Sequence, residues 1–250
     1  RKYAVSTVGY KKEEILKYCA SAAYESGEVT TGQVRSGNGF GTGYSKSDAL
    51  IKAIAEAVER YYSGEFFFQK KTSFKRLKQK IRPADFWIYN DKDISSVKFA
   101  PFDDSAVYAW VRGNHIKTKK DVFVLADQVF YPLSKSVLGY QPVYKTNSSG
   151  VAADTSKDRA GERALLELIE RDAIALAWYA GNQIYRIDNN ILPPNIRVKC
   201  QFWKRRGFLV NFYDITVDSI PVVLCSFTNS KTHPFLVIGG GANYSFEKAL

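Results

Sequence analysis

The stretch AEAVER at residues 55–60 has a near copy, LELIER, at residues 166–171. A segment of small residues precedes each copy, SGNGFGTG at residues 36–43 in one case and SSGVAA at residues 148–153 in the other. From the start of that segment to the glutamate pair the distance is about twenty residues both times. A loop followed by an E-x-x-E-R helix, found twice in this order, predicts a repeated structural unit.

Each copy also carries a helix-start signal. Ser45 stands three residues before Asp48, and Thr155 stands three residues before Asp158, which in each case is close to a capping box. Residues 49–62 contain no Gly or Pro and are rich in Ala, Glu and Ile, so we expect them to be helical. The two glutamate pairs are therefore predicted to lie on capped helices.

The two motifs bring carboxylates together in pairs. Residues three apart on a helix lie on the same face, where two like charges repel each other unless a cation lies between them. Carboxylate oxygens are ligands that Mg²⁺ prefers, with phosphate oxygens completing its octahedron. Arg60 and Arg171 can reach phosphate directly, and the glycine and serine segments offer backbone N–H groups to the same anion. The predicted metal ligands are Glu56, Glu59, Glu167 and Glu170.

A single E-x-x-E-R motif is most often a solvated helix face. Apolar residues surround both pairs here, Ile54 and Val58 in the first and Leu166 and Ile169 in the second. Helices that are apolar nearly all round tend to be buried, and buried carboxylates need a cation or another partner. Together with the duplication, this favours a metal–nucleotide site.

Composition limits the class of protein. Hydrophobic residues make up 45% of the 250 residues, which is typical of a globular chain. Three cysteines and two histidines are too few for a disulfide scaffold or a His-based metal site, so a reduced, cytoplasmic setting is expected. No apolar stretch approaches the roughly 20 residues that span a bilayer. The net charge of +11 favours an acidic partner or a solvated basic surface.

Helices and strands are mixed without strict alternation, which predicts an α+β fold. Residues 12–24 have helical spacing, whereas five short runs read as strands: residues 107–111, 122–125, 208–213, 222–227 and 235–238. A basic run at residues 70–82 is either a solvated surface or a docking site for an acidic peptide or nucleic acid. We expect one domain over residues 1–250, incomplete at its C-terminus because the chain stops in what reads as the first turn of a helix.

These motifs resemble the YcaO family. SGNG at residues 36–39 resembles the family's Ser-Gly-Lys-Gly loop, and EAVERY at residues 56–61 matches its first glutamate helix. SGVAA at residues 149–153 with ELIERDA at residues 167–173 matches the second, and GGGA at residues 239–242 resembles the glycine-rich turn before a late helix. The resemblance runs from about residue 34 to the end of the chain.

The resemblance implies a mixed α/β domain in which the paired glutamates hold Mg²⁺ bridging the phosphates of ATP. By position, Glu56, Glu59, Glu167 and Glu170 would be metal ligands. The implied nucleotide contacts are Ser36, Gly37, Asn38, Gly39, Arg60 and Arg171. The implied chemistry is attack of a nucleophile on a peptide amide, phosphorylation of the oxyanion by ATP and loss of phosphate. No residue is assigned as a catalytic acid or base.

The sequence departs from the family pattern at several positions. Lys52 stands where members usually have Ser, and Asn38 replaces the lysine of the loop. Asp154-Thr155-Ser156 replaces a common Gly-Asn-Thr, so an expected Asn ligand is missing, with Asp154 or Thr155 as substitutes. A divergent enzyme and a non-catalytic homologue both remain open.

Within the resemblance, cyclodehydration of Cys, Ser or Thr to azolines in a precursor peptide is the favoured activity, and thioamide formation is its nearest competitor. A scaffold subunit that has lost turnover is the second hypothesis. We expect a separate ThiF-like or leader-binding partner protein and allow for a homodimer. A nucleic-acid-binding protein is disfavoured, because paired carboxylates repel phosphate unless a metal ion is bound.

Overall fold

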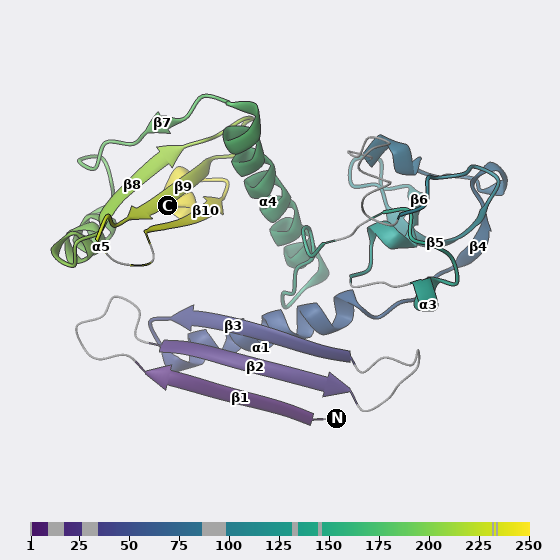
Figure 1. Cartoon of the computed structure of the whole chain (residues 1–250), viewed down its shortest axis with the longest axis horizontal. Helices are drawn as coiled ribbons and strands as arrows, with labels where there is room; N and C mark the ends of the chain where they lie inside the picture. Colours follow the sequence, from purple (N-terminus) through teal and green to yellow (C-terminus); the bar gives the residue numbers. More distant parts are fainter. Residues whose placement is uncertain are drawn as a thin grey trace. The chain divides into compact units, whose positions relative to one another are not determined.

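The computed structural model describes residues 2–9, 18–26, 35–86, 99–131, 135–144, 147–231, 233 and 235–250. The chain forms two compact units, Arg1–Ala153 and Asp154–Leu250. Each unit carries one of the two E-x-x-E-R helices (Figure 1). In the described part of the chain, no helix is both long and apolar enough to cross a bilayer.

The first unit begins with a three-stranded antiparallel sheet in the order β1-β2-β3. Its strands are β1 (Lys2–Gly9), β2 (Tyr18–Ser26) and β3 (Arg35–Gly43), and helix α1 (Lys46–Ser63) packs along them (Figure 1). The helix expected for residues 12–24 is wrong from Tyr18 onward, while residues 12–17 lie outside the described part. Ala20 and Ala22 are buried two residues apart, which is the period of a strand.

Strand β3 is the glycine-rich segment that was expected to be a loop. Every second residue of its C-terminal half is a glycine, and these glycines face α1. A Cβ atom built on Gly39 would lie 2.1 Å from the carbonyl oxygen of Ala53, and one on Gly41 would lie 2.1 Å from that of Ala49. The strand and the helix therefore approach each other backbone to backbone, and the loop prediction is corrected.

The rest of the first unit is a small sheet in the order β4-β5-β6, made of β4 (Lys70–Ser73), β5 (Val107–Asn114) and β6 (Asp121–Leu125). Two short helices, η1 (Phe74–Arg76) and η2 (Pro83–Phe86), lie between β4 and β5 in the chain, and two more, η3 (Ala126–Gln128) and α3 (Lys135–Leu138), follow β6. The core of this sheet centres on Trp110 and Leu125, both fully buried. Part of the basic run packs against the core of this sheet. Lys80 Nζ donates a hydrogen bond of 2.6 Å to the Phe74 carbonyl and lies 4.0 Å from the centroid of the Phe74 ring.

A buried carboxylate anchors the chain beside this small sheet. Asp127 is 1% exposed, accepts a hydrogen bond of 2.5 Å from the Tyr140 hydroxyl and accepts one of 2.8 Å from the Val143 backbone N–H. Both partners lie in the segment that leads toward the second unit. The carboxylate thus ties this connecting segment to η3.

Replacing Asp127 by Ala is expected to lower the free energy of unfolding by about 2–4 kcal/mol, because it leaves a buried hydroxyl and a buried N–H without their acceptor. Urea unfolding followed by tryptophan fluorescence measures the change. Asp85→Ala, at an exposed carboxylate of the same unit, is the matched control and should stay within about 0.5 kcal/mol of the parent protein. Equal losses in the two variants would contradict the anchoring role.

The stability of this unit should also depend on pH through Asp127. Burial raises the pKa of Asp127 above its ordinary value, although hydrogen bonds from Tyr140 and Val143 oppose the rise. The folded state then binds more protons than the unfolded state, so the free energy of unfolding falls as pH rises from about 3.9 through the folded pKa. Urea midpoints measured from about pH 4 to pH 7 should fall less in Asp127→Asn than in the parent protein. Parallel slopes would refute this assignment.

The second unit consists of α4 (Lys157–Ala175), a π-helical turn η4 (Leu176–Ala180), α5 (Pro194–Arg205), the short α6 (Phe246–Ala249) and a four-stranded sheet. The sheet has the antiparallel order β10-β9-β8-β7 and contains β7 (Tyr185–Arg186), β8 (Leu209–Asp214), β9 (Val222–Thr228) and β10 (Leu236–Ala242).

The five strands expected from the sequence are confirmed as β5 and β6 in the first unit and β8, β9 and β10 in the second. The triple glycine, expected as a turn, lies inside β10 instead.

Candidate functional site

Both glutamate helices begin at a serine cap. The Ser45 hydroxyl accepts a hydrogen bond from the Asp48 N–H at 3.1 Å, as the capping signal predicted. In the second helix the cap is Ser156, whose hydroxyl accepts from the Arg159 N–H at 3.3 Å. The predicted cap Thr155 is therefore wrong by one residue. Its N–H and hydroxyl both donate to the Asp154 carboxylate instead.

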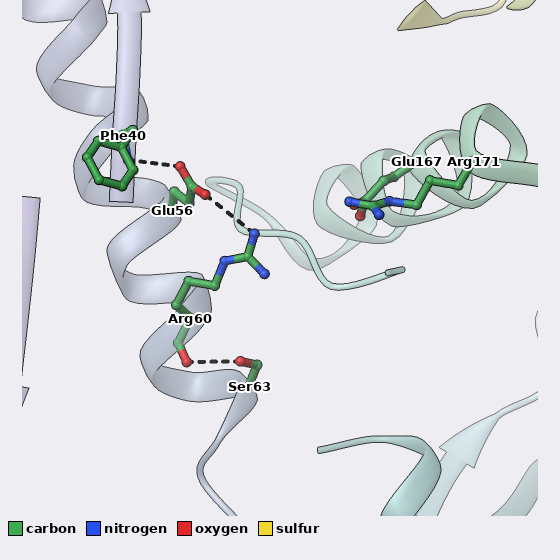
Figure 2. A network of polar contacts seen from close by, with 6 residues as sticks. All are labelled: Phe40, Glu56, Arg60, Ser63, Glu167 and Arg171. Atoms are coloured by element: carbon green, nitrogen blue, oxygen red, sulfur yellow. Dashed lines mark hydrogen bonds and ion pairs between the residues drawn. The ribbon is translucent and has the colours of Figure 1, made fainter. Parts of the chain in front are cut away.

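The first glutamate pair lies on α1 beside β3. Glu56 accepts a hydrogen bond of 2.9 Å from the Phe40 backbone N–H and forms an ion pair of 3.4 Å with Arg60 (Figure 2). Its side chain is 35% exposed and Glu59 is half-buried, so neither carboxylate is enclosed. The contact with Phe40 fixes the Glu56 carboxylate against the glycine-rich strand that the sequence associates with nucleotide binding.

The second pair lies on α4 beside β10. Glu167 accepts a hydrogen bond of 2.8 Å from Arg171 Nε, as Glu56 does from Arg60 in the first unit (Figure 2). Glu170 packs closely on Gly240: a Cβ atom built on Gly240 would lie 2.8 Å from Oε1 of Glu170. Burial raises the pKa of Glu170, Arg171 opposes the rise and the charge of Glu167 adds to it. Glu170 is thus a half-buried carboxylate that a cation would stabilise in its charged form.

The prediction that both glutamate helices are apolar nearly all round and therefore buried is wrong for these helices. On α1 the buried face consists of Ala49, Ala53, Ala57 and Ser63, whereas Ile54 is 45% exposed. On α4 Leu168 is 46% exposed. The argument for a cation therefore rests on the paired spacing of the carboxylates and on the burial of Glu170, and not on enclosure of all four glutamates.

The donor set fits a magnesium nucleotide. Each helix offers two carboxylates on one face, and hard oxygen ligands of this kind suit Mg²⁺. In each helix the arginine pairs with the glutamate four residues before it, and a helix pair at this spacing contributes only about 0.3–0.5 kcal/mol. Phosphate oxygens can therefore draw Arg60 and Arg171 away at little cost. No group of three or more His, Cys, Asp or Glu side chains suited to a metal is found among the described residues. The four-glutamate site stays a prediction.

The positions that depart from the family pattern are engaged in the structure. Lys52 Nζ donates to the Thr42 carbonyl and to Asp48 Oδ2, each at 3.1 Å. Asp154 has a side chain only 6% exposed and is paired with Arg159 at 3.4 Å and Arg163 at 2.5 Å. Hydrogen bonds from the Thr155 N–H and hydroxyl, together with the positive charges of Arg159 and Arg163, hold the pKa of Asp154 below its usual range, although burial opposes them. Its role as a substitute metal ligand would require displacement of both arginines.

Sequence reasoning did not identify Arg159 and Arg163 as part of this site. They lie four residues apart on α4, so both guanidinium groups occupy one face of the helix and reach back to the carboxylate that precedes its cap. The four-residue spacing of Arg159 and Arg163 was the signal in the sequence that could have predicted their shared pairing with Asp154.

Known proteins resemble this chain over most of its length. The chain matches the family model described as YcaO cyclodehydratase, ATP- and Mg²⁺-binding, over residues 40–250. No curated protein matches it. A solved heterocyclase in complex with substrate and cofactor has a TM-score of 0.77 at 21% identity, and the match covers 98% of this chain and 36% of that one.

Two further structures share the fold. A YcaO protein from Methanopyrus kandleri bound with AMPPCP and Mg²⁺ has a TM-score of 0.68 at 18% identity, with 100% of this chain and 58% of that chain covered. The E. coli microcin synthetase McbBCD complex gives 0.68 at 15% identity, covering 97% and 63%. The chain thus spans about a third to under two thirds of these relatives. The expected mixed α/β fold is confirmed.

Proposed function

Because the chain belongs to the YcaO family, we propose that it binds ATP and Mg²⁺ and activates the backbone amide of a peptide substrate. The observation that carries the proposal is the recurrence of an E-x-x-E-R helix, each with its arginine paired to the first glutamate. The proposed metal ligands are Glu56, Glu59, Glu167 and Glu170. The proposed nucleotide contacts are Ser36, Gly37, Asn38, Gly39, Arg60 and Arg171.

Each group has a distinct task in this proposal. The glutamates hold the cation and so keep the phosphate chain in place, and the arginines bind phosphate oxygens through their planar fork. ATP, when bound, supplies the phosphoryl group that turns the amide oxygen into a leaving group. The Glu56 carboxylate already contacts β3 through the Phe40 N–H, which would keep the nucleotide segment and the metal ligands of the first unit in register.

The proposed product is an azoline, formed when a Cys, Ser or Thr side chain of the peptide attacks the preceding amide. Support comes from the neighbours whose names specify a heterocyclase and a microcin synthetase. Thioamide formation is the alternative within the same amide activation. The second of these neighbours is a multi-subunit complex. We therefore also propose a separate protein that delivers the peptide.

A scaffold subunit without turnover is the second candidate function. The observation that favours it is the engagement of Asp154 by Arg159 and Arg163, because this places two cations where a further acidic or amide ligand was expected. The ion pair of Lys52 with Asp48, at a position where the family usually has Ser, points the same way. Such a subunit would still bind nucleotide if the four glutamates hold the metal.

Calorimetric titration with a non-hydrolysable ATP analogue tests the proposal. We expect micromolar to millimolar binding that requires Mg²⁺, because the paired carboxylates repel phosphate when no cation lies between them. Mixing with EDTA should abolish the heat of binding, and Mg²⁺ in excess should restore it. A folded protein that binds no nucleotide at millimolar concentration would refute both the enzyme and the nucleotide-binding scaffold.

A further inference from the structure

A cavity of about 260 Å³ lies in the second unit between α5 and β8, and no residue of the glutamate helix α4 is among the described residues that line it. Arg197 and Lys204 contribute cations to its wall, and Leu192, Phe208 and Val210 contribute apolar groups. Leu192 is 2% exposed and Val210 is 6% exposed, so the floor belongs to the core of the unit. The cavity therefore combines an apolar floor with a basic rim.

The charge of the rim has one sign. Arg197 and Lys204 are seven residues apart on α5, which places them two turns apart on one face of the helix. Gln201 lies between them and also lines the cavity. No carboxylate is found among the described residues that line it. The rim is built to attract an anion, and the neutral groups between the cations can donate hydrogen bonds to it.

Strand β8 adds a feature that selects a peptide. On one side β8 pairs with β9 along its whole length, but on the other side β7 pairs only with Tyr213 and Asp214. Ile187 still donates to the Phe212 carbonyl at 2.9 Å, after which the chain turns away. Because backbone groups alternate along a strand, those of Val210 point to the same side as those of Phe212. Among the described strands, none pairs with β8 at Val210 on the side that faces the cavity.

We propose that this cavity binds a short acidic segment of the substrate peptide in extended form. The proposal deepens the proposed function and rests on it. Backbone groups at Val210 would continue the ladder of β8, an apolar side chain would lie over Leu192 and Phe208, and acidic side chains would pair with Arg197 and Lys204. Half-buried Cys200 also lines the cavity, where burial raises its pKa, so it offers a neutral thiol to the ligand.

The strand edge decides between a peptide and a nucleic acid. A strand edge recognises a peptide backbone through paired N–H and C=O groups, which nucleotides cannot match. Single-stranded nucleic acid instead needs aromatic platforms along a basic groove. Among the described residues that line the cavity, Phe208 is the one aromatic side chain, whereas Trp203 of α5 packs against the core cluster of this unit. A single ring offers no row of stacking platforms for successive bases.

The test uses a fluorescein-labelled hexapeptide in which glutamate alternates with leucine, titrated into the full chain and followed by fluorescence anisotropy. The double variant Arg197→Gln, Lys204→Gln should weaken binding about tenfold, because it removes both cations that line the cavity and would pair with the acidic side chains of the peptide. Arg205→Gln removes a charge from the same helix outside the cavity and should change the affinity less than twofold. The same peptide with glutamine in place of glutamate should bind at least tenfold more weakly.

Equal losses in Lys204→Gln and Arg205→Gln would overturn the proposal, since they would indicate attraction to a diffuse basic surface. Displacement of the peptide by a short single-stranded oligonucleotide, with the same dependence on Arg197 and Lys204, would overturn it in favour of nucleic acid. The peptide is titrated with no nucleotide present, and the ATP analogue is titrated separately. Nucleotide binding without peptide binding would refute this inference alone, whereas peptide binding without nucleotide binding would refute the proposed function alone.

Discussion

Replacing Gly41 by Ala is expected to destabilise the first sheet by about 2–3 kcal/mol, and replacing it by Val should cost more. A Cβ atom at Gly41 would lie 2.1 Å from the Ala49 carbonyl oxygen and 2.6 Å from the Ala53 backbone nitrogen. These are backbone atoms of α1, which cannot rotate away as a flexible side chain would. Strand and helix would have to separate, and the buried alanine face of α1 would lose its contacts.

Urea unfolding followed by far-ultraviolet circular dichroism measures the loss. Gly113→Ala is the matched control, because Gly113 lies in β5 and a Cβ atom there would meet nothing within 4 Å. That substitution should be neutral or stabilise by up to about 1 kcal/mol through a lower entropy of the unfolded chain. Gly41 is chosen over Gly39 because Gly39 is a proposed nucleotide contact. Indistinguishable unfolding curves for the two alanine variants would show that β3 does not pack on α1.

The close packing of β3 on α1 was only partly predictable from the sequence. The glycines at 39, 41 and 43 recur every second residue, which is the period of a strand. Their abundance nevertheless favoured a loop, since glycine is depleted in strands. The segment is a strand because of its partner in the fold. Alanines at every fourth position of α1 leave room for the glycine backbone of β3 to pack directly on the backbone of the helix. Local propensity does not report such a partner.

The helix boundaries and the paired carboxylates were predictable because they depend on local spacing. Ser45 as a cap and the helix over residues 49–62 follow from short-range signals, and both are observed. The strand at Tyr18–Ser26 was missed because its small residues suit several structures, and pairing with β3 decides among them. The engagement of Asp154 by Arg159 and Arg163 was missed for a similar reason. A carboxylate in a family position suggested a ligand, but its actual partners depend on how the first turn of α4 is capped.

The glutamate pairs themselves are tested most sharply at Glu170. We expect Glu170→Gln to lower ATP turnover at least about 100-fold, measured with the peptide substrate and the partner protein present. That loss corresponds to about 2.7 kcal/mol, which is within what a metal ligand contributes to stabilising charge in a transition state. Glutamine keeps the shape that packs against Gly240 but removes the charge that would hold the cation.

The fold should survive this substitution, which separates a functional loss from a structural one. Because burial raises the pKa of Glu170, its charge is unfavourable to folding when no cation is bound, and a neutral glutamine should leave the urea midpoint equal or higher. Glu162→Gln, an exposed carboxylate on the same helix, should retain turnover. Normal turnover in Glu170→Gln would remove this residue from the site. Loss of turnover in both variants would instead show that turnover depends on the total charge of α4. If Glu170 is a metal ligand, only its substitution should reduce turnover.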